Sequence, residues 1–188
     1  MKRTNIFTIP LFEAEYPNNL DEIVRNIKEL RDDRFGVQKS NNNGFQSVED
    51  LHTHEFMQPI MKFICESSGD AFEAIGNPKN HCVVEGCWYN INDNLNSHNQ
   101  MHIHSGTLSG VFYLQAPEGS GNLQLLNTGM NQMWPGHQNS RFRCDANAFH
   151  YTVKPKAGML YLWPSYVYHS VDSNSKDVER ISISFNLS

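Results

Sequence analysis

The sequence lacks the features that mark several large classes of protein. It has no apolar run near the ~20 residues that a membrane-spanning helix needs, so we expect no membrane partner. Charged residues make up only 19% of the chain, the net charge is −5 and no basic cluster stands out, which argues against a nucleic-acid partner. Residues 1–12 start basic but have no long apolar core and no small-residue cleavage site, so we expect no signal peptide and a cytoplasmic location.

Cysteine is scarce, and its spacing does not indicate a metal site. The four cysteines are Cys65, Cys82, Cys87 and Cys144; none forms a C-x-x-C pair, and no zinc-knuckle spacing is present. We therefore expect free thiols in a reducing compartment. The chain also has no internal repeat and no linker that would divide it, so we predict one domain over residues 1–188.

The secondary structure that the sequence predicts changes near residue 78. Residues 5–12 resemble an edge strand with a proline, residues 19–31 have helical spacing, and Ser47-Val-Glu-Asp50 resembles a capping box that opens a helical region reaching residue 75. Six short segments rich in β-branched and aromatic residues follow, at 82–91, 109–114, 122–126, 150–153, 159–163 and 180–187. We predict a mainly β, α+β domain in which a helical support region (1–78) packs on one sheet of an antiparallel sandwich or jelly roll (79–188).

Two histidines two residues apart are the first candidate site. If the segment is extended, His102 and His104 lie on one face, and His169 is the candidate for a third ligand from a neighbouring strand. An H-x-H pair alone is more often a pair of surface histidines. The pair at His52 and His54 has the same spacing but falls in an expected helix, where residues i and i+2 diverge, so we expect it to be solvated.

A lone arginine begins the last expected strand. The alternation in Arg180-Ile-Ser-Ile-Ser184 places the arginine and both serines on one face. A buried guanidinium needs an anion, and its planar fork suits a carboxylate held at two points. The alternative is a structural arginine paired with Asp177 or Glu179.

In their order and spacing, these segments resemble the Fe(II)- and 2-oxoglutarate-dependent oxygenases, most closely the small oxygenases related to prolyl hydroxylases. The resemblance covers residues 88–188, with a weaker match through the helices. Its motifs are His102-Ile-His104, Ser109-Gly-Val-Phe-Tyr113, Gly121-Asn-Leu123, Pro155-Lys-Ala-Gly158-Met-Leu160, Pro164-Ser165, His169-Ser-Val171 and the strand from Arg180 to Asn186. It implies a double-stranded β-helix (a cupin-like jelly roll) and a site whose catalytic chemistry belongs to the metal.

The resemblance also implies residue roles. His102 and His169 match the iron-binding histidines, and Arg180 matches the residue that pairs with the distal carboxylate of 2-oxoglutarate. Further cosubstrate contacts are implied for Ser182, Tyr113 and Asn92. For Tyr113, a position in the apolar core is an equally good explanation.

His104 departs from the family pattern, because most of the superfamily has aspartate or glutamate at that position. Three neutral imidazoles would leave Fe(II) with a formal charge of +2, which should favour a dianionic cosubstrate. Alternatively, His104 points away and water takes that position. His98 and Asp172 are spare polar candidates whose spacing does not match.

The activity that this resemblance implies is that of a dioxygenase, a hydroxylase using Fe(II), 2-oxoglutarate and O2, with ascorbate as a candidate stimulant and a homodimer as a candidate state. The substrate is left open between a protein prolyl residue and a small metabolite. The alternatives are a three-histidine cupin-like dioxygenase or isomerase that does not use 2-oxoglutarate, and an inactive jelly-roll binding module. We also expect residues 127–147 to form a substrate lid, and Trp88, Trp134 and Trp163 to lie in the core or in a pocket wall.

Overall fold

The computed structural model describes residues 2, 8–33, 35–80, 82–127 and 148–188, so the expected lid and Trp134 lie outside the described residues, apart from residue 127. The helical elements are α1 (Asp21–Asp32), α2 (Gln58–Ala74) and the 3₁₀ turns η1 (Leu51–Thr53) and η2 (Glu55–Met57). The strands are β1 (Phe12–Glu15), β2 (Asn41–Asn42), β3 (Phe45–Gln46), β4 (Val84–Asn92), β5 (His98–His102), β6 (Leu108–Gln115), β7 (Leu123–Leu126), β8 (His150–Val153), β9 (Met159–Pro164), β10 (His169–Val171) and β11 (Arg180–Leu187).

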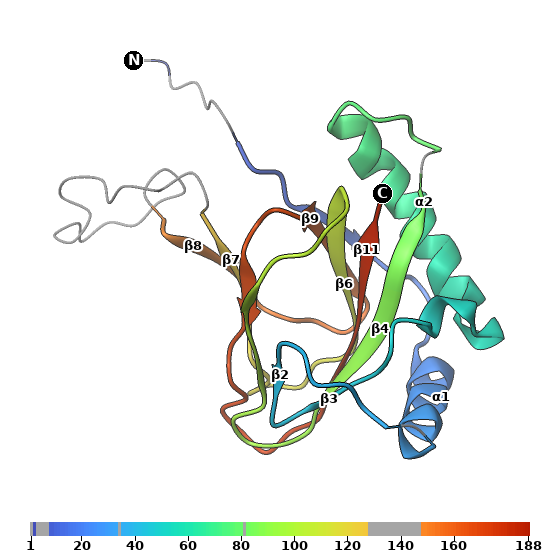
Figure 1. The fold of residues 1–188 in the computed structure, drawn as a ribbon, viewed down its shortest axis with the longest axis vertical. Helices are drawn as coiled ribbons and strands as arrows, with labels where there is room; N and C mark the ends of the chain where they lie inside the picture. Colours follow the sequence, from blue (N-terminus) through green and yellow to red (C-terminus); the bar gives the residue numbers. More distant parts are fainter. Residues whose placement is uncertain (1, 3–7, 34, 81, 128–147) are drawn as a thin grey trace, which may run out of the picture.

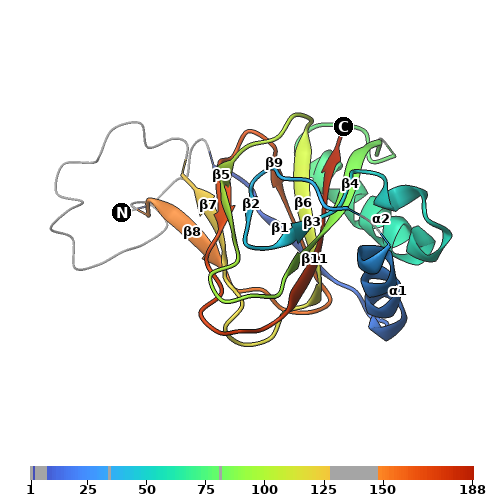
Figure 2. The same ribbon diagram turned by 60° about the horizontal axis from the view of Figure 1, so that its bottom comes forward.

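Two antiparallel sheets face each other, as Figures 1 and 2 show. The larger sheet has the strand order β1-β9-β6-β11-β4-β3 and the smaller has the order β2-β5-β10-β7-β8. Strands β4 to β11 are therefore shared between two four-stranded layers, β9-β6-β11-β4 and β5-β10-β7-β8. This topology is a double-stranded β-helix, and it confirms the predicted jelly roll.

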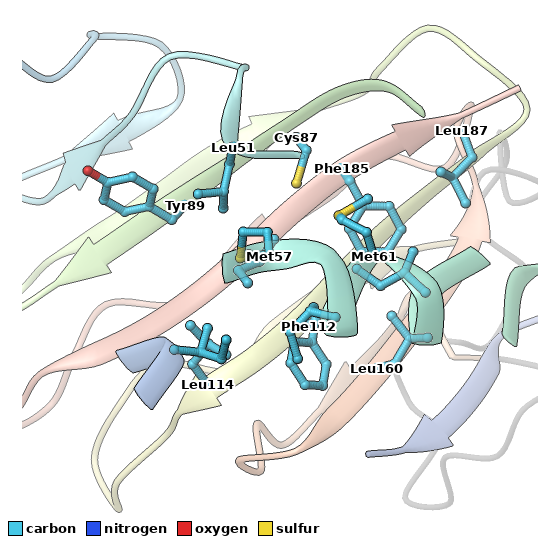
Figure 3. Close-up of a cluster of buried hydrophobic side chains, with 14 of the residues drawn as sticks. Leu51, Met57, Met61, Cys87, Tyr89, Phe112, Leu114, Leu160, Phe185 and Leu187 are labelled. Carbon is cyan, nitrogen blue, oxygen red and sulfur yellow. The ribbon is translucent and has the colours of Figure 1, made fainter. Parts of the chain in front are cut away.

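Both helices cover the outer face of the larger sheet, also as predicted (Figures 1 and 2). The helices contribute fully buried isoleucines such as Ile27, Ile60 and Ile64, which join one apolar cluster with residues of the sheet. Figure 3 shows this layer, in which Met57 and Met61 lie among side chains of the sheet that include Phe112, Leu160 and Phe185. Burial of this layer stabilises the packing of residues 1–78 on the sheet.

Strand β11 separates the apolar core from the candidate site. Its residues Ile181, Ile183, Phe185 and Leu187 join the cluster beneath the helices. Arg180, Ser182 and Ser184 line the cavity between the two sheets on the opposite face. The period-2 alternation of the sequence predicted this division, because successive side chains of a strand point to opposite faces.

Two predictions for the N-terminal half were wrong in detail. Residues 8–11 are not a strand; β1 begins at Phe12, just after Pro10, which cannot donate to a ladder, although β1 does lie at an edge of its sheet. Ser47 does not cap a helix, because its hydroxyl accepts a hydrogen bond from the Tyr89 N–H and donates to the Val48 carbonyl. The helix begins later, at Gln58, after the two 3₁₀ turns.

Four short strands were not anticipated. β2 and β3 have two residues each, and β10 has three. β5 has the polar sequence HNQMH, and His102 is its last residue. Residues 1–78 consequently supply β1, β2 and β3 to the sheets as well as the covering helices.

Candidate metal centre

The three predicted histidine ligands meet in the space between the two sheets. His102 at the end of β5 pairs directly with His169 at the start of β10, and His104 follows two residues after His102. The ring centroids are 4.3 Å apart for His102 and His169, 4.8 Å for His102 and His104, and 5.0 Å for His104 and His169. One nitrogen of each ring lies within 4.8 Å of the others, close enough to hold one metal ion. The structure therefore brings His104 toward its partners rather than away from them.

Backbone carbonyls orient two of the rings. The Nδ1 atom of His102 lies 2.5 Å from the Gln100 carbonyl oxygen, and that of His169 lies 3.0 Å from the Val167 carbonyl oxygen. An Nδ1–H donated to a carbonyl leaves the Nε2 lone pair free for a metal. For His104, no such carbonyl contact is found within the part of the chain that the structure describes.

Burial keeps the three imidazoles neutral. Desolvation lowers the pKa of His104 to about 4 and that of His169 to about 3, and it also lowers the pKa of His102. Neutral imidazole is the form that binds a metal, so the site does not need to lose a proton near neutral pH.

Arg180 carries a buried charge that forms no ion pair with an acid among the described residues, although Asp172 lies near enough to act on it electrostatically. The side chain is 1% exposed, and its Nη1 donates to the Gly121 carbonyl at 2.9 Å. Its Nε has no hydrogen-bond partner, and no carboxylate forms an ion pair with it, among the described residues. Glu179, one of the two acids considered above, pairs with Lys28 at 2.5 Å. Burial lowers the pKa of the guanidinium, which nevertheless stays charged. An anionic ligand would stabilise this buried charge.

Tyr113 and Ser182 lie directly opposite each other on neighbouring strands, and both line the same cavity as Arg180. Burial raises the pKa of Tyr113 to about 12, so its hydroxyl is a neutral donor at physiological pH. The arginine, the tyrosine and the serine can therefore offer hydrogen bonds to one carboxylate.

Asn92 lies beside Arg180 in the register of β4 and β11, but the asparagine of β4 that lines the cavity is Asn90. The Asn90 amide nitrogen is 3.2 Å from the Ser184 hydroxyl, while its buried Oδ1 finds no partner among the described residues. Asn90 was not among the residues predicted from the sequence. The alternation of β4 gives Trp88, Asn90 and Asn92 one face, so it makes Asn90 a candidate beside Asn92 but does not choose between them.

The remaining candidates lie away from the histidines. His98 contacts the Asn96 carbonyl through Nδ1, and Asp172 accepts from Gln124 at 2.7 Å. His52 and His54 are half-buried in the segment of the 3₁₀ turns rather than solvated. Cys65, Cys82 and Cys87 are free thiols, and Cys144 lies outside the described residues.

The cavity has a volume of about 240 Å³ and a polar lining at both ends. Arg180, Ser182 and Tyr113 lie toward one end, and the histidines lie farther along the sheets with Trp88 and Trp163 beside them. Buried polar atoms of Asn90, Trp163 and Arg180 lack partners among the described residues, and all three residues line this cavity. Such atoms are costly to bury unless a ligand satisfies them, so the residues fit a metal ion together with a carboxylate-bearing molecule.

The fold and the cavity define a jelly-roll protein in which three histidines that could hold a metal ion share one cavity with a buried arginine. The sequence profile of the family described as "Putative 2OG-Fe(II) oxygenase" matches residues 86–186, just over half of the chain. The chain belongs to this family of oxygenases, whose cofactor is Fe(II) and whose cosubstrate is 2-oxoglutarate. No curated protein matched the chain in a search of their sequences.

Solved structures with the same fold include several oxygenases. A prolyl-4-hydroxylase from Pseudomonas putida is 14% identical, with a TM-score of 0.63, and the match covers 95% of this chain and 93% of that one. The α-ketoglutarate-dependent epimerase SnoN from nogalamycin biosynthesis is 13% identical, with a TM-score of 0.68 over 93% of this chain and 74% of that one. HygX from Streptomyces hygroscopicus, solved with nickel and 2-oxoglutarate, is 10% identical, with a TM-score of 0.60 over 95% and 82% of the two chains. These similarities support the double-stranded β-helix. Among the described residues, no helix is long and apolar enough to cross a membrane.

Proposed function

We propose that this single-domain protein is a hydroxylase that couples the oxidative decarboxylation of 2-oxoglutarate to the hydroxylation of a C–H bond in a second substrate. The observation that carries the proposal is the placement of three neutral imidazoles and one buried, unpaired guanidinium along a single cavity. An iron-binding site alone would not need the arginine, and a carboxylate-binding site alone would not need the three histidines.

His102, His104 and His169 would hold the iron. When bound, Fe(II) supplies the activation of O2 that protein side chains cannot provide. The carbonyls of Gln100 and Val167 fix two of the rings, so that Nε2 faces the metal position.

The residues of β6 and β11 would hold 2-oxoglutarate. Arg180 neutralises its distal carboxylate, and the hydroxyls of Tyr113 and Ser182 supply further hydrogen bonds. Because the Tyr113 hydroxyl stays protonated and the arginine stays charged, the anion is held in the same way across the physiological pH range. The apolar residues Val111, Leu123 and Val171 line the cavity as well and limit the access of water.

We infer the chemical nature of the second substrate only to the level of a C–H donor. Two of the solved neighbours are prolyl hydroxylases, one of them in complex with a peptide fragment of hypoxia inducible factor. SnoN is an epimerase of nogalamycin biosynthesis. A protein prolyl residue and a small metabolite therefore both belong in a substrate screen.

The test is the release of succinate from 2-oxoglutarate after addition of Fe(II) and ascorbate under air, against peptides and small metabolites. We expect metal-dependent succinate formation that a fitting substrate accelerates. Absence of any metal-dependent turnover of 2-oxoglutarate across a broad panel would refute the proposal.

A three-histidine dioxygenase that does not use 2-oxoglutarate is the second candidate, favoured by the lack of a carboxylate in the histidine cluster among the described residues. In that case Arg180 would bind the carboxylate of the substrate itself. O2 consumption with Fe(II) and a carboxylic acid, in the absence of 2-oxoglutarate, would identify this activity. An inactive binding module would turn over neither 2-oxoglutarate nor another carboxylic acid after addition of Fe(II).

A further inference from the structure

We propose that the indole N–H of Trp163 binds the carboxylate at the 2-oxo end of 2-oxoglutarate, an inference that rests on the proposed function. The protein would then hold the cosubstrate at both ends. Arg180 would bind the distal carboxylate, and Trp163 would bind the carboxylate beside the metal.

Trp163 is a buried donor without a partner. The residue is 2% exposed, lines the cavity, and has an Nε1 atom with no hydrogen-bond partner among the described residues. An indole N–H can only donate, so the missing partner must be an acceptor. A buried donor left unsatisfied is destabilising, and such groups in native proteins usually have a ligand or a role.

The position of Trp163 selects one end of the cosubstrate. Its ring centroid is 5.0 Å from that of His169, so it lies at the metal end of the cavity. Trp163 is paired with Ser109 on β6, whereas Ser182 is paired with Tyr113, four residues farther along that strand. Four residues of a strand span about 13 Å, which places the indole away from the Arg180 end.

The chemistry of the cosubstrate fits this donor. At neutral pH, 2-oxoglutarate has two carboxylates and a keto group, all of them acceptors. A 2-oxo acid that chelates a metal uses its keto oxygen and one carboxylate oxygen, which leaves the other oxygen of that carboxylate free. In a buried cavity this oxygen needs a donor, and the Trp163 N–H is an unpaired donor beside the metal ligands.

The competing explanation is that Trp163 orients the ring of His169, one of the proposed metal ligands. The two rings meet edge to face, with an interplanar angle of 67°, so the indole could instead orient a metal ligand through a weak contact with its ring. The two explanations differ in the affinity that they affect. The first concerns 2-oxoglutarate and the second concerns the metal.

The experiment compares Trp163→Phe, which keeps an aromatic ring but removes the N–H, with Tyr161→Phe as the control. Tyr161 lies two residues earlier on the same face of β9, and its substitution also removes one polar hydrogen. Ni(II) affinity and then the affinity of the Ni(II)-loaded protein for 2-oxoglutarate are measured by calorimetry, which needs no turnover. We expect Trp163→Phe to weaken 2-oxoglutarate binding by about 10- to 100-fold, with Ni(II) affinity and the control unchanged.

Weakened Ni(II) binding with unchanged 2-oxoglutarate binding would assign Trp163 to His169 and overturn the inference, as would no change in either affinity. Weakening of both affinities to the same degree would also overturn the inference, because it would show a general disturbance of the site. Failure of the wild-type Ni(II) protein to bind 2-oxoglutarate would instead remove the proposed function. If Trp163→Phe does not fold, β-(3-benzothienyl)alanine introduced at position 163 replaces the N–H by sulfur in a ring of nearly the same shape, and the same expectations apply.

Discussion

Arg180 is a buried cation held by the Gly121 carbonyl and by no acid among the described residues. Without an anionic ligand, the charge is only partly compensated, which is an unfavourable arrangement for stability. A residue kept in such a state is better explained by binding than by folding. Removing it should therefore affect ligand affinity more than stability.

We expect Arg180→Ala to raise the apparent KM for 2-oxoglutarate by at least ~100-fold, because a charge-assisted pair with the distal carboxylate is lost. The thermal unfolding temperature of the ligand-free protein should fall little or rise. Arg180→Lys keeps the charge but not the planar fork, so its apparent KM for 2-oxoglutarate should lie between that of the wild-type protein and that of Arg180→Ala. Steady-state succinate kinetics and thermal melts measure both effects, and a large loss of stability with unchanged KM would contradict the assignment.

His104 is the residue whose ligand role the sequence left open, and the structure places its ring within reach of the other two. If it is a ligand, His104→Ala should weaken Fe(II) binding by more than the ~10–100-fold that loss of a ligand's hydrogen-bond partner costs. His104→Asp creates the two-histidine, one-carboxylate set of related oxygenases and should retain the metal. Anaerobic Fe(II) titration gives both affinities; an unchanged affinity in His104→Ala would remove His104 from the ligand set.

At the scale of elements, side chains of β9 and β11 meet above β6, which lies between them, because β6 carries a glycine on its core face. A Cβ at Gly110 would lie 2.3 Å from the Phe185 ring and 2.7 Å from a Leu162 methyl group. At Gly86 on β4, the nearest atom to an added Cβ would be the flexible Glu49 carboxylate at 3.1 Å. The two glycines thus differ in how much of the core an alanine would displace.

We expect Gly110→Ala to lower the free energy of unfolding by about 1–3 kcal/mol through overpacking of this layer. Gly86→Ala, the matched control, should change it by less than about 1 kcal/mol because the glutamate side chain can move aside. Urea denaturation of both variants measures the difference. Equal effects in the two variants would show that the contacts around Phe185 adjust freely.

The elements also show what the sequence could and could not predict. β11 was predicted with its observed bounds, Arg180–Leu187, because regular alternation of Ile and Ser is a strong strand signal. β5 and β10 were missed because HNQMH and HSV have little apolar pattern of their own and become strands by pairing with each other. Asn90 was missed for a related reason. The choice between Asn90 and Asn92 depends on where the sheets enclose a cavity, and local sequence does not encode that position.

At the scale of the whole molecule, residues 1–78 and 79–188 share one core. Helical residues such as Ile27, Ile64 and Phe72 are fully buried against the larger sheet, while β1, β2 and β3 extend both sheets. Residues 79–188 alone would expose this apolar face. These contacts support the proposal of a single domain over the whole chain.

The three buried histidines should make the stability of the metal-free protein depend on pH. Their pKa values are lowered by burial, to about 4 for His104 and about 3 for His169, whereas the unfolded chain titrates near 6.5. Between those values the unfolded chain binds more protons than the native chain, so stability falls as the pH decreases. Above about pH 7 the histidines contribute no slope, because they are neutral in both states.

We therefore expect the free energy of unfolding of the metal-free protein to be nearly constant from pH 7 to 8 and to fall below about pH 6.5. Each histidine that is neutral only in the native state contributes a slope of up to about 1.4 kcal/mol per pH unit. Urea denaturation with a chelator present, at intervals between pH 8 and pH 5, measures the curve. His169→Asn should flatten it; an unchanged slope in that variant would show that other groups cause the dependence.

The alternation along β11 gives this protein one further property. Because Arg180, Ser182 and Ser184 alternate with Ile181, Ile183 and Phe185, the same eight residues form both one wall of the proposed cosubstrate site and the centre of the core. A slip of one residue in this strand would turn the arginine into the apolar layer and the isoleucines into the cavity. An insertion or deletion inside β11 should therefore abolish folding and cosubstrate binding together. New substrate preferences can evolve through the loops around the cavity, while this strand can change only by replacement of side chains in a fixed frame.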